Sequence, residues 1–231
     1  MVEFRNVVTT LGGKRILDGL SFVVPSGQIT FLLGRSGAGK SVALRHIPGL
    51  LHADSGEVLF AGRPVPQDEQ ALAEVRRQCG VVFQFPALLD ALTVEGNLRL
   101  ARPEVAPAAL LERVGLSRDL LTRYPHALSF GVQKRVSMAR ALTSDPRLLL
   151  FDEPTTGLDP VAAKATHTLI AELSRSLGAT ALVVSHDIAA ALEFADQILL
   201  LERGQLVDQG SPSAIRRSCA PFTRQFLEAA G

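Results

Sequence analysis

The sequence of 231 residues lacks a long apolar run, although 47% of its residues are hydrophobic. No stretch approaches the roughly 18 apolar residues of a membrane-spanning helix, so a role at a membrane would require a separate pore-forming partner. Internal repeats and low-complexity segments are lacking as well. A chain of this length and apolar content predicts one α/β domain with an appended lobe and a large core.

Charge of one sign and cysteine are also scarce. Lys and Arg number 24 against 23 Asp and Glu, and the net charge of +1 gives no electrostatic argument for a nucleic-acid partner. Cys79 and Cys219 have no CxxC or metal-site spacing and are expected to be ordinary thiols in a reducing cytosol. The first residues contain no apolar targeting region. Four histidines share no metal spacing and are expected at the surface or with hydrogen-bond partners: His46, His52, His126 and His167.

A glycine-rich loop follows a short apolar run near the N-terminus. Residues 29–33 predict a buried strand, and the next eight residues read Gly-Arg-Ser-Gly-Ala-Gly-Lys-Ser. The glycines let the chain curl, so that backbone N–H groups and the start of a helix point at one place. Lys40 can reach the β- and γ-phosphates there, and the Ser41 hydroxyl can bind Mg²⁺. The alternative is a glycine-rich turn that only starts a helix. The predicted phosphate site consists of Gly34, Arg35, Ser36, Gly37, Ala38, Gly39, Lys40 and Ser41.

A second apolar run, residues 148–151, ends in two adjacent acids. It lies between two prolines and predicts a buried parallel strand. A carboxylate at the end of such a strand suits Mg²⁺, which assigns Asp152 to the metal. Glu153, one residue further, can polarise an attacking water. Without the glycine loop, the same pair would indicate only a solvated acidic turn.

Four further segments follow in order along the chain. Gln84 is a polar residue at the end of an apolar run, and His186 ends another such run. Residues 128–132 read Leu-Ser-Phe-Gly-Val just before an amphipathic segment, and Asp159 lies in the sequence Gly-Leu-Asp-Pro. Together with the glycine loop and the acidic strand, this order resembles the nucleotide-binding subunit of ABC transporters. The resemblance covers essentially the whole chain.

The resemblance implies the ABC ATPase fold, an α/β P-loop NTPase core with a mostly parallel sheet, an N-terminal antiparallel β part and an inserted helical lobe. Residues 1–231 would form a single ABC ATPase domain, with 1–89 and 145–231 as the nucleotide-binding core and 90–144 as the helical signature lobe. The implied activity is Mg²⁺-dependent ATP hydrolysis coupled to transport. The implied location is cytoplasmic, peripheral on the inner face of the cytoplasmic membrane.

The resemblance also assigns roles to the motif residues. Glu153, His186 and Gln84 would be catalytic, and Gln84 would join Ser41 and Asp152 as a ligand of Mg²⁺. Permease subunits would dock a short helix beside Gln84. There the apolar side chains of residues 85–89, above all Phe85, Leu88 and Leu89, predict a groove. The alternative is that these side chains belong to the core of the lobe.

The segment called the signature departs from the family pattern Leu-Ser-Gly-Gly-Gln. Phe130 replaces the first glycine and Val132 replaces the glutamine. In this family two copies pair head to tail, and the homodimer would bring Ser129, Gly131 and Asp159 to ATP held by the other copy. Alternatively, Ser129 only caps the following helix. The Phe130 ring either turns aside into an apolar pocket or holds the dimer partly open. We expect slow but real hydrolysis, which Phe130→Gly would accelerate.

A second departure concerns the nucleobase. The family places an aromatic residue before the turn at residues 12–13, where it stacks on adenine, and Leu11 stands at this position. A leucine offers an apolar contact without a π-face, so the selectivity for the base should be modest. Otherwise Leu11 is simply a residue that flanks the turn.

The stretch Gly80–Val94 resembles the ATPase of Mla-type phospholipid transport, also described as a toluene-tolerance or MCE-associated system. Residues 40–46 and 222–227 are similar too. This resemblance implies a multi-spanning permease and a periplasmic lipid-binding MCE protein as partners. One alternative is the ATPase of a polar amino-acid importer, which shares the catalytic motifs. Another is a weakly active or non-catalytic ATP-binding assembly subunit, because Phe130 alters the signature.

The rest of the chain predicts alternating strands and helices. Val161, Ala165, Leu169 and Leu173 lie four apart and predict the apolar stripe of a helix over 161–177, which Gly178 ends. Strands are expected over residues 2–8, 16–24, 29–33, 57–60, 198–201 and 206–207, and helices over 41–50, in most of 90–144, and once in the tail.

Overall fold

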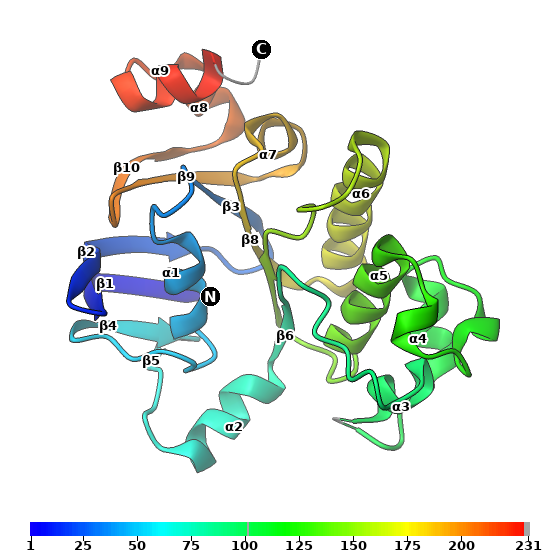
Figure 1. The fold of residues 1–231 in the computed structure, drawn as a ribbon. Coiled ribbons are helices and arrows are strands. Elements are labelled where there is room, and N and C mark those ends of the chain that lie inside the picture. Colours follow the sequence, from blue (N-terminus) through cyan, green and yellow to red (C-terminus); the bar gives the residue numbers. More distant parts are fainter. Residues whose placement is uncertain (101, 229–231) are drawn as a thin grey trace.

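The computed structural model describes residues 1–100 and 102–228. These residues form two β-sheets and a group of helices (Figure 1). The smaller sheet is antiparallel, with the strand order β2-β1-β4-β5. Its strands are β1 (Val2–Leu11), β2 (Lys14–Val24), β4 (Ser55–Phe60) and β5 (Arg63–Pro64). The antiparallel N-terminal part expected from the sequence is therefore present.

The larger sheet has the order β10-β9-β3-β8-β7-β6 and is parallel except for β10, which runs antiparallel to β9. Its strands are β3 (Ile29–Leu33), β6 (Cys79–Val82), β7 (Leu148–Asp152), β8 (Thr180–Ser185), β9 (Gln197–Glu202) and β10 (Gln205–Gly210). Leu33 pairs with Ser185, and Asp152 pairs with Val184. The carboxyl ends of β3, β7 and β8 therefore meet at one edge, which is where an open α/β sheet binds its ligand.

The larger sheet lies between two apolar cores, because side chains alternate along its strands. Ile29, Phe31 and Leu33 point into a core shared with helices α3 to α8, whereas Leu32 points into a core with α1 and the smaller sheet. The helices are α1 (Lys40–His46), α2 (Glu69–Arg77), α3 (Val94–Arg99), α4 (Pro107–Arg113), α5 (Phe130–Ala141), α6 (Pro160–Leu177), α7 (Ile188–Phe194), α8 (Pro212–Arg217) and α9 (Pro221–Glu228), with short 3₁₀ turns at Arg118–Leu120 and Pro125–Ala127.

Residues 90–100 and 102–144 contain α3, α4, α5 and both 3₁₀ turns and no strand, in agreement with the mostly helical pattern of the sequence. Helices α3, α4 and α5 lie together at one side of the molecule (Figure 1). Val136 and Met138 of α5 belong to the same apolar cluster as Phe151 of β7. The helical segment is therefore joined to the larger sheet by shared packing. In the described part of the chain, no helix combines the length and the apolar character needed to cross a membrane.

Several elements differ from the sequence-based expectation. Helix α2 was not expected; Asp68 caps it by accepting a hydrogen bond of 2.8 Å from the N–H of Ala71. Helix α1 ends at His46 rather than at residue 50, because Pro48 cannot continue it. The tail forms two helices, α8 and α9, instead of one.

The expected apolar stripe of α6 is wrong at its first member. Val161 is 81% exposed. Residues four apart drift around a helix of 3.6 residues per turn, so a long series with this spacing cannot face one core throughout. The face that is buried consists of Thr166, His167, Ile170, Ala171, Leu173 and Ser174.

The expectation for the histidines holds for His46 and fails for His167. Nδ1 of His46 is 2.7 Å from the carbonyl of Val42, and its Nε2 is 2.9 Å from the hydroxyl of Thr9. His167 is buried, and within the described residues its Nε2 has no hydrogen-bond partner. Its ring centre lies 6.0 Å from that of Phe31 and 6.0 Å from that of Phe194, so two aromatic rings pack beside it.

Candidate functional site

The glycine loop connects β3 to α1 and passes close to neighbouring backbone. Gly39, at the N-terminus of α1, has φ 104°, and a Cβ on it would lie 2.8 Å from a methyl carbon of Leu17. A Cβ on Gly34 would lie 2.3 Å from the carbonyl oxygen of Leu201. Neither position accepts a side chain, so the sequence of the loop follows from its packing as well as from phosphate chemistry.

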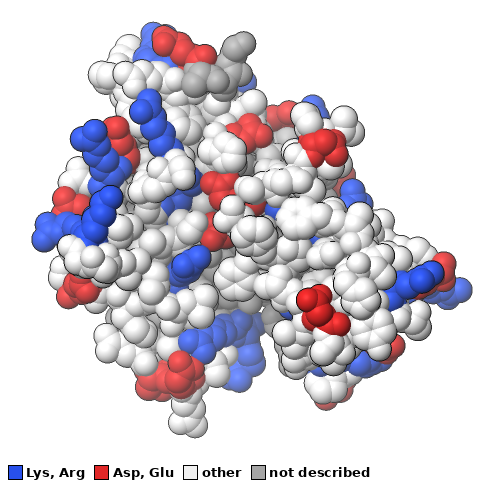
Figure 2. Space-filling view, in the orientation of Figure 1, with Lys and Arg blue, Asp and Glu red and all other residues white. Residues whose placement is uncertain are grey.

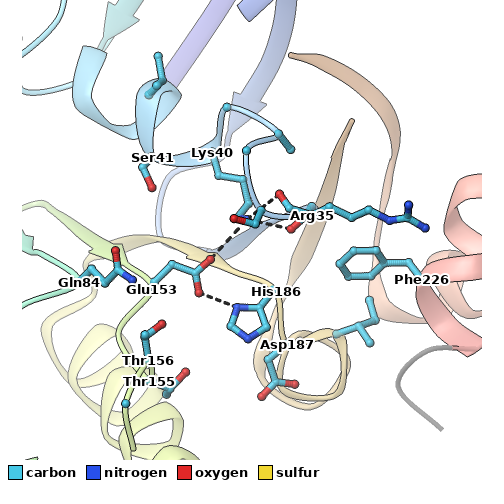
Figure 3. Close-up of a pocket in the computed structure, with 18 of the residues that line it drawn as sticks. Arg35, Lys40, Ser41, Gln84, Glu153, Thr155, Thr156, His186, Asp187 and Phe226 are labelled. Atoms are coloured by element: carbon cyan, nitrogen blue, oxygen red, sulfur yellow. Dashed lines mark hydrogen bonds and ion pairs between the residues drawn. The ribbon is translucent and has the colours of Figure 1, made fainter. Parts of the chain in front are cut away.

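Lys40 is buried at the centre of this loop. Its ammonium donates hydrogen bonds of 2.8 Å to the carbonyl of Gly34 and 3.2 Å to that of Arg35. It also lies 3.4 Å from Oε1 of Glu153 (Figure 3). The loop thus holds a positive charge beside its own backbone N–H groups, which is the arrangement that binds a phosphate.

Ser41 and Asp152 come together from α1 and β7, as the sequence predicts. The Ser41 hydroxyl donates a hydrogen bond of 2.6 Å to Oδ1 of Asp152. Burial raises the pKa of Asp152, while the hydrogen bond from Ser41 opposes this shift. The structure thus places a hydroxyl and a carboxylate oxygen, both of which Mg²⁺ accepts, next to each other.

These two residues fit a magnesium site that is completed by the nucleotide. Within the described residues, no cluster of three or more His, Cys, Asp or Glu could hold a metal by itself. Mg²⁺ commonly uses one or two protein ligands and takes the others from phosphate and water. The donor set of Ser41 and Asp152, with the amide of Gln84 lining the same cleft, agrees with that chemistry.

Glu153 and His186 form a second pair at the ends of β7 and β8. Nδ1 of His186 is 2.8 Å from Oε2 of Glu153, so this carboxylate contacts His186 with one oxygen and Lys40 with the other (Figure 3). The backbone of Glu153 has φ 48°, a conformation that costs free energy for a residue with a Cβ. Two residues far apart in the sequence, Lys40 and His186, therefore converge on the carboxylate of Glu153.

A cleft of about 1230 Å³ contains this constellation. All eight residues of the glycine loop line it, together with Leu11, Gln84, Glu153 and His186. On the face shown in Figure 2, Lys and Arg alternate with Asp and Glu. Attraction of a phosphate therefore comes from the local groups of the loop, rather than from a field of one sign over this face.

The cleft also has lining residues that the sequence analysis missed. Thr155 and Thr156 follow the acidic strand, and their hydroxyls next to two acids were an available signal. Gln225 and Phe226 of α9 line the cleft as well. Oε1 of Gln225 accepts a hydrogen bond of 3.4 Å from Arg35, across a distance of 190 residues in sequence, which no local pattern indicates.

The sequence profile of the ABC transporter family matches residues 17–156. The chain belongs to this family as an ATP-binding subunit. MlaF of Escherichia coli K12, the ATP-binding protein of an intermembrane phospholipid transport system, is 38% identical over 239 aligned positions, which cover 99% of this chain and 88% of MlaF. The methionine import protein MetN of Rhizobium johnstonii is 40% identical over 220 positions, and the match covers 91% of this chain and 60% of MetN. The chain thus spans about three fifths of the length of that relative.

Solved structures agree with the family assignment. The dimeric cassette MJ0796 bound to ADP and Pi has a TM-score of 0.82 and is 30% identical, with 92% of this chain and 99% of the cassette covered. CbiO1 of Clostridium perfringens has a TM-score of 0.83 at 27% identity, with 99% and 98% covered. The ABC ATPase fold expected from the sequence is confirmed. The chain is an ABC ATPase that uses ATP and Mg²⁺.

Three residues expected at the nucleotide do not line the cleft of this single ABC subunit. Ser129 caps α5 through a hydrogen bond of 3.4 Å from the N–H of Val132. Asp159 caps α6 by accepting hydrogen bonds of 3.0 Å from Val161 and Ala162. Gly131 lies in the first turn of α5. Contact of Ser129, Gly131 and Asp159 with ATP stays a prediction that requires a second copy.

The ring of Phe130 lies over a lysine and against the loop after Glu153. Its centre is 5.2 Å from the ammonium of Lys134, and a Cβ on Gly157 would come within 3.1 Å of the ring. Within one subunit the ring packs against residues of its own chain. Its effect on the closure of a dimer stays a prediction. The surroundings are not the purely apolar pocket expected, because the ring also covers a charged group.

Proposed function

We propose that this ABC subunit hydrolyses ATP at the cleft and thereby powers the transport of phospholipid through a separate permease. The observation that supports the catalytic part is the position of Glu153, whose two carboxylate oxygens contact Lys40 and His186. In this proposal, Glu153 orients and deprotonates the attacking water, and His186 holds the carboxylate in place. Mg²⁺, when bound, neutralises charge on the phosphates.

The other residues of the cleft position the nucleotide. Lys40 exchanges its bonds to the loop carbonyls for the β- and γ-phosphates, to which a charged donor binds more strongly. Ser41 and Asp152 hold the metal, and Gln84 adds an amide oxygen on the same side. Leu11 contacts the base by apolar packing alone, so discrimination between ATP and GTP should be weak.

The catalytic unit in this proposal is a homodimer. Ser129 and Gly131 at the start of α5 would face the phosphates bound by the second copy, and Asp159 would lie at the same interface. The dimeric state of the similar cassette MJ0796 supports this arrangement. ATPase activity should then rise with the square of the subunit concentration at low concentration, measured over a dilution series.

The loop 85–89 is the proposed docking site of the permease on the cytoplasmic side of the membrane. Phe85 is 68% exposed and Leu89 is 50% exposed, whereas Leu88 packs against the core. The backbone of the loop is held firmly: the buried Asn97 bonds to both the N–H and the carbonyl of Leu89, at 2.8 and 3.0 Å, and Arg140 donates to the carbonyl of residue 87. A fixed loop that presents large apolar side chains to solvent suits a partner helix.

Of the three residues predicted to form the groove, Phe85 and Leu89 are exposed, and Leu88 is half-buried against the core. Charged substitutions at Phe85 and Leu89 should release the permease without unfolding the ATPase. Leu88→Asp should instead unfold it, because this side chain packs against the core. Retention of the permease by the double variant Phe85→Asp/Leu89→Asp in a pull-down would contradict the docking proposal.

Phospholipid is the proposed cargo because the MlaF match covers most of both chains. A methionine or other polar amino acid is the second candidate, supported by the 40% identity to MetN. Purification of the subunit with its native membrane partners, followed by mass spectrometry of the co-purified molecules, separates the two. Bound phospholipid and an MCE protein support the first candidate, and a solute-binding protein for an amino acid supports the second.

A further inference from the structure

A second buried lysine contacts the loop that carries Glu153. Lys134 of α5 is only 2% exposed, and its ammonium donates a hydrogen bond of 2.7 Å to the carbonyl of Pro154. Lys134 does not line the cleft, so phosphate binding does not explain it. Burying a charged amine is unfavourable unless the site uses it. The atom it holds belongs to the residue directly after Glu153.

The backbone at Glu153 needs support from its surroundings. Its φ of 48° is a conformation that persists only where neighbouring groups hold it. On one side, the N–H of Glu153 donates a hydrogen bond of 3.0 Å to the carbonyl of Val184 in β8. On the other side, the Pro154 carbonyl is held by Lys134. The strained peptide therefore has one anchor before it and one after it.

Phe130, the first residue of α5, packs against both Lys134 and the loop after Glu153. Its ring covers the Lys134 ammonium at 5.2 Å, a cation–π distance. The same ring lies against Gly157, where an added Cβ would be 3.1 Å from a ring carbon. Phe130 is thus in contact with both the lysine and the loop that the lysine holds. The unusual residue of the signature and the buried lysine form one unit with residues 154–157.

We propose that Lys134, covered by Phe130, is a positioning residue for Glu153. Its ammonium holds the Pro154 carbonyl, and this keeps the left-handed backbone that directs the Glu153 carboxylate toward Lys40, His186 and the attacking water. The inference rests on the proposed role of Glu153 in hydrolysis. It assigns Lys134 an effect on the rate of the chemical step and none on the affinity for ATP.

The test uses the full chain with Lys134→Met, which removes the donor and the charge at similar length, and Lys134→Arg, which keeps both. Lys164→Met, at an exposed lysine paired with Glu193, is the matched control. Because a misplaced catalytic group costs up to about a hundredfold, kcat of Lys134→Met should fall roughly tenfold or more. KM and Kd for ATP should stay within about twofold of wild type, and Lys134→Arg should recover most of kcat.

Hydrogen exchange of the nucleotide-free protein gives a second readout. The amides of Glu153, Thr156 and Leu158 should exchange faster in Lys134→Met than in wild type or Lys164→Met, because their hydrogen bonds depend on the held loop. Unchanged kcat and unchanged exchange would overturn the proposal. So would a rise of KM at unchanged kcat, or a failure of Lys134→Arg to recover activity.

Two further variants separate a folding defect from loss of the Lys134 contact, and the role of Lys134 from that of Glu153. Lys134→Leu also removes the donor and the charge and replaces Lys134→Met if the latter does not fold, with the same expected direction in kcat and exchange. Glu153→Gln tests the underlying role: if it still hydrolyses ATP at the wild-type rate, the role of Glu153 fails. In that case the exchange result still decides whether Lys134 holds the loop.

Discussion

Lys40 and Lys134 are both buried, at 6% and 2% exposed, yet their surroundings differ. Lys40 donates to carbonyls of its own loop, lies 3.4 Å from the Glu153 carboxylate and lines the cleft, where a ligand can reach it. Lys134 donates to the Pro154 carbonyl beneath the ring of Phe130, where no ligand reaches it. The comparison shows that one side-chain type serves two purposes around one carboxylate. An open site lets a lysine bind phosphate, and a sealed site lets a lysine support the backbone.

The largest effect is expected from replacing Glu153, the residue whose carboxylate lies beside Lys40 and whose backbone Lys134 supports. Glu153→Gln should lower the rate of ATP hydrolysis by at least about a hundredfold, because the amide cannot accept the proton of the attacking water. Nucleotide binding should remain, since the phosphate loop is intact. Steady-state ATPase measurements and titration with a fluorescent ATP analogue test the two halves of this expectation. Turnover near that of wild type would exclude Glu153 as the base.

Lys40→Ala tests whether only the lysine in the cleft contributes to the affinity for ATP. It removes a charged donor to the phosphates, so the Kd for ATP should rise roughly 10- to 100-fold. Lys134→Met should leave the same Kd nearly unchanged, because Lys134 does not line the cleft. Equal losses of affinity in the two variants would mean that the structure does not separate the two roles.

Phe130→Gly gives a smaller effect, whose direction is informative. From the sequence, glycine is expected to increase hydrolysis by letting a second copy approach. The contacts of the ring with Lys134 and Gly157 lead us to expect the opposite. Loss of a cation–π contact of 0.5–1 kcal/mol corresponds to a fall in kcat of about two- to fivefold. A rise in kcat, measured with Mg²⁺ present, would show that the ring is an obstacle.

The smallest effect concerns the pH dependence of stability. Burial lowers the pKa of Lys134 from 10.5 to about 8, although Glu153 opposes the shift. The unfolded chain therefore binds a proton at this residue that the folded protein releases between pH 8 and pH 10.5. The free energy of unfolding of wild type should rise with pH in this window relative to Lys134→Met, by at most about 1 kcal/mol per pH unit. Urea unfolding of both proteins at several pH values measures the difference in their free energies of unfolding. A fall of this difference with rising pH would contradict the prediction.

Much of the fold was predictable from local patterns. The buried strand 29–33 was expected with its observed bounds, and Gly178 ends α6 as expected, in a left-handed conformation. Helix α2 was missed although local signals were available: Asp68 caps it, most of its residues are good helix formers, and it has Glu69 in the first turn and Arg76 and Arg77 in the last. The stripe of α6 was misjudged because a spacing of four was followed along the whole helix. In such cases packing against the sheet, which a local pattern does not contain, decides which face is buried.

The sequence by itself determined the family and the residues of the phosphate loop, because glycines, a lysine and two adjacent acids at fixed spacings are needed by the chemistry of a bound nucleotide. Only the tertiary structure decided which groups touch. The order of β3, β8 and β7 places Lys40, His186 and Glu153 together, although more than a hundred residues separate the first from the other two. It also decided that Phe130 covers Lys134, that Lys134 holds Pro154 and that Gln225 reaches Arg35. These contacts join separate elements, and their distances depend on how whole strands and helices pack rather than on the spacing along the chain.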